Sequence, residues 1–203
     1  MTTLSASSPL PMTPAEPTAR PKMTAENRIP GDMTRDQLLD RIMRVNHAGE
    51  YGAVRIYQGQ MAVIGKGQHG DTLKHMLEQE VVHKEYFQKA IGERQGRPTV
   101  LQPVWHVAGW MLGAGTALLG ERAAMACTVA VEEAIDDHYR EQAELLGDDE
   151  AELRDTIERF RAEELEHRDI GYENGAEQAP AYPLLHAAVK SGTRLAIWLS
   201  ERI

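Results

Sequence analysis

The chain has 203 residues, enough for one domain with a sizeable hydrophobic core but too few for two independent enzyme domains. Its 31 acidic residues outnumber its 22 basic residues, and the formal net charge of -9 disfavours binding to the phosphates of a nucleic acid. The single cysteine, Cys127, excludes an internal disulfide, an iron–sulfur cluster and a zinc site made of several cysteines. Any metal site must therefore use histidines and carboxylates.

The beginning of the chain differs in composition from the rest. Six of the ten prolines lie within the first 30 residues, which are also rich in serine and threonine and show no apolar period. Such a segment cannot bury enough apolar surface to offset its chain entropy. We therefore expect residues 1–34 to form a disordered tail and residues 35–203 to form one domain. The basic residues of the tail favour a targeting role, whereas its acidic residues and prolines oppose a transit peptide.

After Pro30 the apolar residues recur at the spacing of α-helices. A first helix is predicted from about Thr34 to the glycine-rich break at 65–70, and a second from there to about residue 96. A third, long helical stretch is expected from Pro103 to Leu146, with a bend among its glycines. A fourth helix follows the turn at 147–149, and a last amphipathic segment follows Pro183. Since no strand pattern is present, the predicted fold class is all-α, a four-helix bundle with additional helices.

Two Glu-x-x-His pairs lie in the second and fourth predicted helices: Glu80 with His83, and Glu164 with His167. The i, i+3 spacing places both side chains of a pair on one helix face. Both pairs also fall within the apolar face of their helix. A charged group buried there is costly unless it is paired or binds a cation. Opposite charge must therefore neutralise both pairs.

The preceding helix in each half supplies a further carboxylate, Glu50 or Glu132. In an antiparallel helical hairpin, residues equidistant from the turn lie at the same height. The midpoint of Glu50 and Glu80 is position 65, and the midpoint of Glu132 and Glu164 is position 148, so both midpoints fall in the predicted turns. Four carboxylates and two imidazoles are thus expected in one core layer, where they would hold two metal ions. Oxygen-rich ligation with one histidine per ion favours iron, or manganese, over copper or structural zinc.

Some assignments stay open from the residues alone. Glu163 lies four residues before His167 and could replace Glu164, and Glu133 neighbours Glu132 but points about 100° away around the helix. The apolar faces favour Glu164 and Glu132 as ligands.

A short run of residues within two turns after Glu132 supplies candidates to accept hydrogen bonds from the ligand histidines, because metal-bound imidazoles usually donate their other N–H to a carboxylate or a similar partner. These residues are Asp136, Asp137 and His138. A solvated acidic helix face is the alternative for Asp137. His47 and Tyr57 are candidates to line the same cavity.

Several strings go beyond simple ligand spacing: RVNHAGE at 44–50, VEE at 131–133, HY at 138–139, EELEH at 163–167, APAY at 179–182 and LSER at 199–202. In these strings the sequence resembles the demethoxyubiquinone hydroxylases of ubiquinone biosynthesis, and the likeness covers about residues 38–203. The resemblance implies a ferritin-like, carboxylate-bridged di-iron monooxygenase. Its implied substrates are a polyprenylated methoxy-methyl-benzoquinol (demethoxyubiquinol) and O2.

The resemblance also implies roles for single residues. The metal ligands would be Glu50, Glu80, His83, Glu132, Glu164 and His167, with Glu80 and Glu164 bridging two iron ions. His138 and Tyr139 match family residues beside the site, where they would take part in proton or electron delivery. The glycines of 113–120 do not match a dinucleotide fingerprint, so electrons would come from an external donor.

The residues themselves favour a lipid substrate. All three tryptophans fall in the two most apolar stretches, 104–119 and 184–199, and tryptophan favours boundaries between apolar and wet environments. No apolar run clearly reaches the roughly 20 residues of a membrane span. The second stretch is amphipathic, with Lys190 and Arg194 opposite Leu195, Trp198 and Leu199, as in interfacial helices. A buried core helix or a dimer face is the alternative.

These features predict a peripheral membrane protein, on the cytoplasmic face of a bacterial inner membrane or, in a eukaryote, at the mitochondrial inner membrane. Gly109 and Gly113 form a small-x-x-x-small pair that lets helices approach closely, which leaves open a homo-oligomer or a place in a biosynthetic complex. No nucleic acid partner is expected. Two other functions remain: iron storage or peroxide disposal on the same bundle, and a non-catalytic quinone or lipid carrier.

Overall fold

The computed structural model describes residues 31–203, so residues 1–30 of the predicted tail lie outside the described residues. The described part contains six α-helices, two 3-10 turns and no strand, which confirms the predicted all-α class. The elements are α1 (Arg35–Ile64), α2 (Gly70–Glu93), α3 (Gln102–Leu118), α4 (Glu121–Leu145), η1 (Asp148–Glu150), α5 (Ala151–Glu173), η2 (Ala176–Gln178) and α6 (Tyr182–Ser200).

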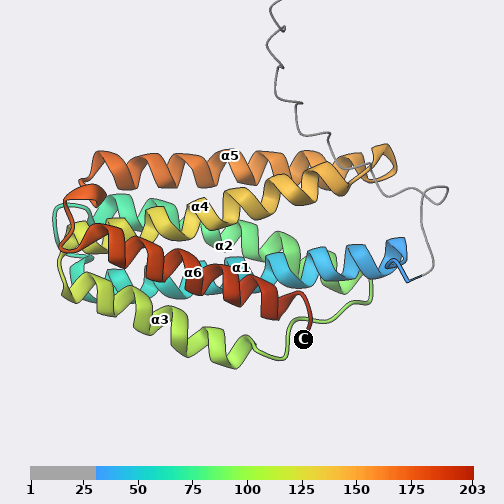
Figure 1. Cartoon of the computed structure of the whole chain (residues 1–203), viewed down its shortest axis with the longest axis horizontal. Helices are drawn as coiled ribbons and strands as arrows, with labels where there is room; N and C mark the ends of the chain where they lie inside the picture. Colours follow the sequence, from blue (N-terminus) through green and yellow to red (C-terminus); the bar gives the residue numbers. More distant parts are fainter. Residues whose placement is uncertain (1–30) are drawn as a thin grey trace, which may run out of the picture.

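The four longest helices form two antiparallel hairpins, α1 with α2 and α4 with α5 (Figure 1). The shorter helices cover one side of this bundle, where α3 packs against α1 and α6 packs against α4. Apolar side chains from the inner faces of the bundle form the core, including Ile42, Phe87, Ile157 and Phe160. The turns at 65–69 and 146–150 connect the two helices of each hairpin, as predicted.

The long third stretch expected between Pro103 and Leu146 is two helices rather than one bent helix. α3 ends at Leu118, and α4 begins at Glu121 and runs back in the opposite direction. Gly120 lies between them with φ +112°, a backbone conformation that residues with a Cβ rarely adopt. This glycine therefore turns the chain where a bend was expected.

The small residues of α3 serve a contact within the chain. A Cβ on Gly109 would lie 2.9 Å from the carbonyl oxygen of Gly52, and a Cβ on Gly113 would collide with the carbonyl of Ile56. The pair thus allows α3 to approach α1 closely, as small residues do wherever helix backbones come together. The predicted close approach is therefore made between two helices of one chain.

The first and last of the strings that carry the family resemblance, at 44–50 and 199–202, meet in space at the end of α6. Arg44 donates from Nε to the carbonyl oxygen of Ser200 at 3.2 Å and from Nη2 to that of Glu201 at 2.8 Å. Trp105 on α3 donates from Nε1 to Oγ of Ser200 at 3.0 Å. The last carbonyls of a helix lack partners within it, and the two Arg44 donors satisfy two of them. The contacts fix α6 against α1 and α3.

The two covering helices leave apolar side chains exposed. On α3 these include Val104, Val107 and Met111, and on α6 Leu184 is 73%, Leu195 57% and Trp198 51% exposed. The basic residues of α6 face the bundle, where Lys190 Nζ lies 2.6 Å from Glu133 Oε2 and Arg194 Nη2 lies 2.9 Å from Asp137 Oδ2. Among the described helices, none has both the length and the apolar character needed to cross a membrane.

Candidate metal centre

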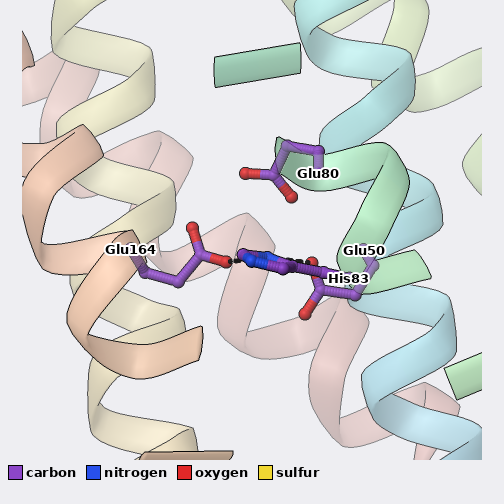
Figure 2. A group of neighbouring side chains, drawn as sticks. All are labelled: Glu50, Glu80, His83 and Glu164. Atoms are coloured by element: carbon purple, nitrogen blue, oxygen red, sulfur yellow. Dashed lines mark hydrogen bonds and ion pairs between the residues drawn. The ribbon is translucent and has the colours of Figure 1, made fainter. Parts of the chain in front are cut away.

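The four bundle helices bring six acidic and histidine side chains into one buried layer. α1 supplies Glu50, α2 supplies Glu80 and His83, α4 supplies Glu132, and α5 supplies Glu164 and His167. Each of the six is at most 1% exposed. The predicted convergence of these residues is thus present, and Figure 2 shows four of them around a common centre.

The six side chains divide into two overlapping groups. Glu50, Glu80, His83 and Glu164 form one, and Glu80, Glu132, Glu164 and His167 form the other; in each, one ligand atom per residue lies within 4.8 Å of the others. Glu80 and Glu164 belong to both groups. Two adjacent cation sites sharing two carboxylates are the arrangement expected of a bridged dinuclear centre.

Both histidines turn the same ring nitrogen toward the carboxylates. Nδ1 of His83 lies 2.9 Å from Oε1 of Glu164 and 3.7 Å from Oε2 of Glu50. Nδ1 of His167 lies 3.2 Å from Oε1 of Glu80 and 3.2 Å from Oε2 of Glu164. The Nδ1 atoms are therefore the ones placed to bind cations.

Several buried atoms of this layer have no hydrogen-bond partner among the described residues. They are Oε2 of Glu50, both carboxylate oxygens of Glu80, Oε2 of Glu132, Oε2 of Glu164 and Nδ1 of His167. A buried polar atom without a partner is costly, and native proteins rarely leave one so. Five carboxylate oxygens and an imidazole nitrogen facing one centre fit hard or borderline divalent cations such as iron and manganese.

Crowding of buried charges shifts the pKa values of this layer. Burial and the neighbouring carboxylates raise the pKa of Glu80 and of Glu132. Burial alone would raise the pKa of Glu164, but the neighbouring imidazoles of His167 and His83 lower it to about 2. Burial opposes the protonation of His83, yet the adjacent carboxylates of Glu164 and Glu50 raise its pKa to about 12. Without cations, the layer thus takes up protons that bound metal would displace.

Two buried tyrosines donate hydrogen bonds to Glu50 and Glu132, the two carboxylates that each belong to only one of the two ligand groups. Tyr57 of α1 donates from its hydroxyl to Oε1 of Glu132 at 3.0 Å, and Tyr139 of α4 donates to Oε1 of Glu50. In both carboxylates the other oxygen, Oε2, is left facing the centre. Tyr139, expected beside the site, and Tyr57, expected to line it, both contact a candidate ligand.

His138 lies in a neighbouring polar cluster. Its Nε2 accepts a hydrogen bond from Nε2 of Gln142 at 2.6 Å, and Gln142 pairs through its side-chain amide with Asn46 at 2.8 Å. Burial and the positive charge of Arg41 lower the pKa of His138 to about 4. The pair of Gln142 and Asn46 therefore joins α4 to α1, and His138 contacts this pair from within α4. His47, the other histidine expected at the cavity, is a buried residue of α1 and follows Asn46 of this cluster in sequence.

The outer nitrogens of the two histidines have partners that the sequence alone did not reveal. Nε2 of His83 lies 2.6 Å from Oε2 of Glu163, and Nε2 of His167 lies 2.9 Å from Oε1 of Gln79. Glu163 thus stands behind a histidine and does not replace Glu164. In each half, the partner is the residue directly before the glutamate of the Glu-x-x-His pair, and it reaches the histidine of the other half.

The expectation that Asp136 and Asp137 hold these histidines is wrong. Asp136 Oδ1 accepts from Nε of Arg161 at 2.6 Å, and Asp137 Oδ2 accepts from Nη2 of Arg194 at 2.9 Å. Both aspartates follow Glu132 by about one turn, but their side chains meet arginines of α5 and α6 toward the surface. Closeness in sequence to Glu132 was therefore a misleading signal.

An apolar cavity of about 330 Å³ lies beside the buried layer, between α1, α3, α4 and α6. Its lining includes Gly49 and Ala53, which neighbour Glu50 on α1, and Val131 and Ile135, which neighbour Glu132 on α4. Trp105 of α3 and residues of α6 complete the wall. The volume is at the lower end of that of small-molecule sites. A flat apolar ring can therefore lie next to the candidate metal ligands.

Comparisons with known proteins agree with this geometry. The family described as "Ubiquinone biosynthesis protein COQ7" matches residues 37–200. The "3-demethoxyubiquinol 3-hydroxylase" of Rhodospirillum rubrum is 61% identical over 183 residues, covering 90% of this chain and 86% of that protein. The human "NADPH-dependent 3-demethoxyubiquinone 3-hydroxylase, mitochondrial" is 52% identical over 169 residues (81% and 78%), and the Saccharomyces cerevisiae "5-demethoxyubiquinone hydroxylase, mitochondrial" 38% over 182 residues (81% and 78%). The chain therefore belongs to the COQ7 family of ubiquinone biosynthesis proteins.

Proposed function

We propose that this chain is a monooxygenase that hydroxylates the ring of demethoxyubiquinol with O2 in ubiquinone biosynthesis. The observation that carries the proposal is the buried pair of ligand groups sharing Glu80 and Glu164, found in a chain whose relatives are named as hydroxylases of this substrate. An iron-storage protein would need a similar metal centre. It would not need the apolar cavity beside that centre.

The proposed cofactor is a pair of iron ions. Glu50 and His83 would hold one ion, Glu132 and His167 the other, and Glu80 and Glu164 would bridge them. When bound, such a pair supplies the redox chemistry that dioxygen activation requires. The unpartnered oxygens and the inward Nδ1 atoms of the buried layer support this ligand set.

The chain's own residues prepare the site by orientation and charge. Tyr139 and Tyr57 each donate to one oxygen of a terminal carboxylate, which aims the other oxygen at the centre. Hydroxylation places one oxygen atom in the ring and releases the other as water, so each turnover consumes two electrons and two protons. We propose that Tyr139 and His138 serve proton or electron delivery, a role supported for Tyr139 by its bond to Glu50.

The electrons would come from an external donor. Residues 31–203 contain no strand and hence no strand–turn–helix unit of the kind that binds dinucleotides. The human and other animal relatives are named as NADPH-dependent. We therefore propose a reduced nicotinamide as the source of electrons for this chain also.

The quinol ring would occupy the cavity, with its prenyl tail leaving between α3 and α6. Both helices line the cavity and expose large apolar side chains, among them Met111, Leu195 and Trp198. Such a surface suits the boundary of a lipid bilayer. We propose that the protein binds a membrane peripherally through α3 and α6 and takes its substrate from the lipid.

Turnover of a short-chain demethoxyubiquinol by the purified, iron-loaded protein tests the function. With O2 and a chemical reductant, mass spectrometry should detect a product heavier by one oxygen atom, labelled when 18O2 is supplied. Glu80→Ala and Glu164→Ala should abolish product, whereas Glu166→Ala, an exposed position of α5, should not. Mineralisation of iron with no hydroxylated quinol would reject the proposal in favour of storage. Tight quinol binding with no hydroxylated product from the iron-loaded protein would reject it in favour of a carrier.

A further inference from the structure

The candidate metal centre is built from two similar halves of the chain. In each half a glutamate is followed seven residues later by a tyrosine, Glu50 by Tyr57 and Glu132 by Tyr139. Each tyrosine donates to the glutamate of the other half. The same crossing holds for the histidines, since the residue before each bridging glutamate contacts the histidine of the other half. The contacts around the two cation sites thus repeat with approximate two-fold symmetry.

The corresponding residues behind the two histidines differ in charge. His83 has the carboxylate of Glu163 at its outer nitrogen, whereas His167 has the amide oxygen of Gln79. The N···O distance is shorter to the charged acceptor, 2.6 Å to the carboxylate of Glu163, than to the neutral one, 2.9 Å to the amide of Gln79. Hydrogen bonds to an ionised acceptor are generally shorter and stronger than bonds to a neutral one. The symmetry is therefore broken at the positions that control the donor strength of the histidines.

We propose that Glu163 is a positioning residue that makes the two metal sites unequal. The cation held by Glu50 and His83 binds first and more tightly, and the cation held by Glu132 and His167 binds second. The inference rests on the proposed di-metal function and adds an order of filling to it. A histidine whose outer N–H is bonded to a carboxylate is fixed in orientation and is a stronger metal donor.

The size of the effect follows from the surroundings of Glu163. Removal of an outer partner of a metal-bound histidine typically lowers metal affinity by about 10- to 100-fold. The Glu163 side chain is 32% exposed, so water screens part of its charge. We therefore expect a difference near the lower limit of this range, about tenfold, between the two binding steps.

Titration of the metal-free full-length protein with Co2+ in the absence of oxygen tests the proposal. Absorption by bound Co2+ reports each binding step and the coordination of the ion. Glu163→Gln keeps an acceptor oxygen and removes the charge, so it should weaken the first step about tenfold and leave the second unchanged. Gln79→Glu should strengthen the second step by a similar factor, a gain that a damaged fold would not produce. The double exchange should invert the order of filling.

Single histidine variants identify which site fills first. His83→Ala should remove the tight step, and His167→Ala should retain it, each variant binding one Co2+ with high occupancy at most. Three results would overturn the proposal and leave the proposed function intact. The first is equal binding constants for the two steps in the wild type, and the second is an unchanged first step in Glu163→Gln with unaltered thermal unfolding. The third is loss of the tight step in His167→Ala. Failure of the wild type to bind two Co2+ per chain would overturn both.

Discussion

Replacing Gly49 with a larger residue should fill part of the cavity. It should weaken substrate binding without changing metal binding or impairing folding. Gly49 lies within α1 and lines the cavity, and a Cβ built on it meets no atom within 4 Å. Gly49→Leu would therefore extend its side chain into open space without displacing the backbone. The neighbouring Glu50 would keep its position, and the metal content should stay at that of the wild type.

The magnitude follows from helix propensity and from lost apolar contact. Glycine inside a helix costs about 0.5–1 kcal/mol relative to good helix formers, so the free energy of unfolding should rise by about this amount. The leucine adds four carbon atoms to a cavity of about 330 Å³. If it displaces contacts worth two buried methylenes of the substrate, at about 0.8 kcal/mol each, binding weakens roughly tenfold.

Steady-state hydroxylation, chemical denaturation and metal analysis check this combination. KM for the quinol should rise about tenfold while stability increases slightly and the metal content is unchanged. Gly115→Leu is the matched control, since Gly115 also lies inside a helix with open space around its Cβ but is not among the residues that line the cavity. An unchanged KM in Gly49→Leu would refute the assignment of the cavity to the substrate. A loss of metal would refute the reasoning that the two sites are independent.

Three further perturbations test the centre, a buried histidine and the apolar surface. Because Glu80 belongs to both ligand groups and Glu132 to one, Glu80→Gln should leave fewer than one metal ion per chain by elemental analysis and Glu132→Gln about one; equal losses would contradict the shared role. Burial and a nearby guanidinium hold the pKa of His138 at about 4, below its usual 6.5. The neutral His138 of the folded state therefore stabilises the protein fully above pH 6.5, and this stabilisation is lost as the pH falls from 6.5 through 4. His138→Gln should therefore reduce the fall in unfolding free energy of the metal-free protein across that window, by at most about 3 kcal/mol; an unchanged slope in denaturant titrations would contradict the shift. Leu195→Gln should weaken co-sedimentation with lipid vesicles more than Val82→Gln, a similarly exposed position on α2, and equal effects would argue against α6 as the membrane surface.

The convergence of the six candidate ligands was predictable because it depends on local regularities. The i, i+3 spacing fixes which residues share a helix face, and a short turn fixes which residues of two helices lie at one height. The midpoint of Glu50 and Glu80, position 65, falls at the start of the turn after α1, and Glu132 and Glu164 each lie 13 residues from the helix ends that border the turn after α4. These two rules required no knowledge of how the hairpins pack together.

The outer partners of the histidines were not predictable by the same rules. Gln79 and Glu163 lie about 100° around their helices from the bridging glutamates, so face arithmetic places them away from the centre. They contact the histidine of the other hairpin, which depends on how α2 and α5 lie beside each other. The turn at Gly120 was hidden for a different reason: it is one of several glycines in an apolar stretch, and periodicity does not tell which of them takes a positive φ.

The acidic string at 132–133 shows how one turn of helix serves two parts of the molecule. Glu132 points into the buried layer, and Glu133, about 100° away, accepts hydrogen bonds from Lys190 at 2.6 Å and from Tyr172 at 2.7 Å. These bonds lower the pKa of Glu133 against the effect of burial. They also attach the charged face of α6 to the bundle. Because the charged side chains of α6 are paired with α4, the apolar side chains of Leu195 and Trp198 are left on its outward face.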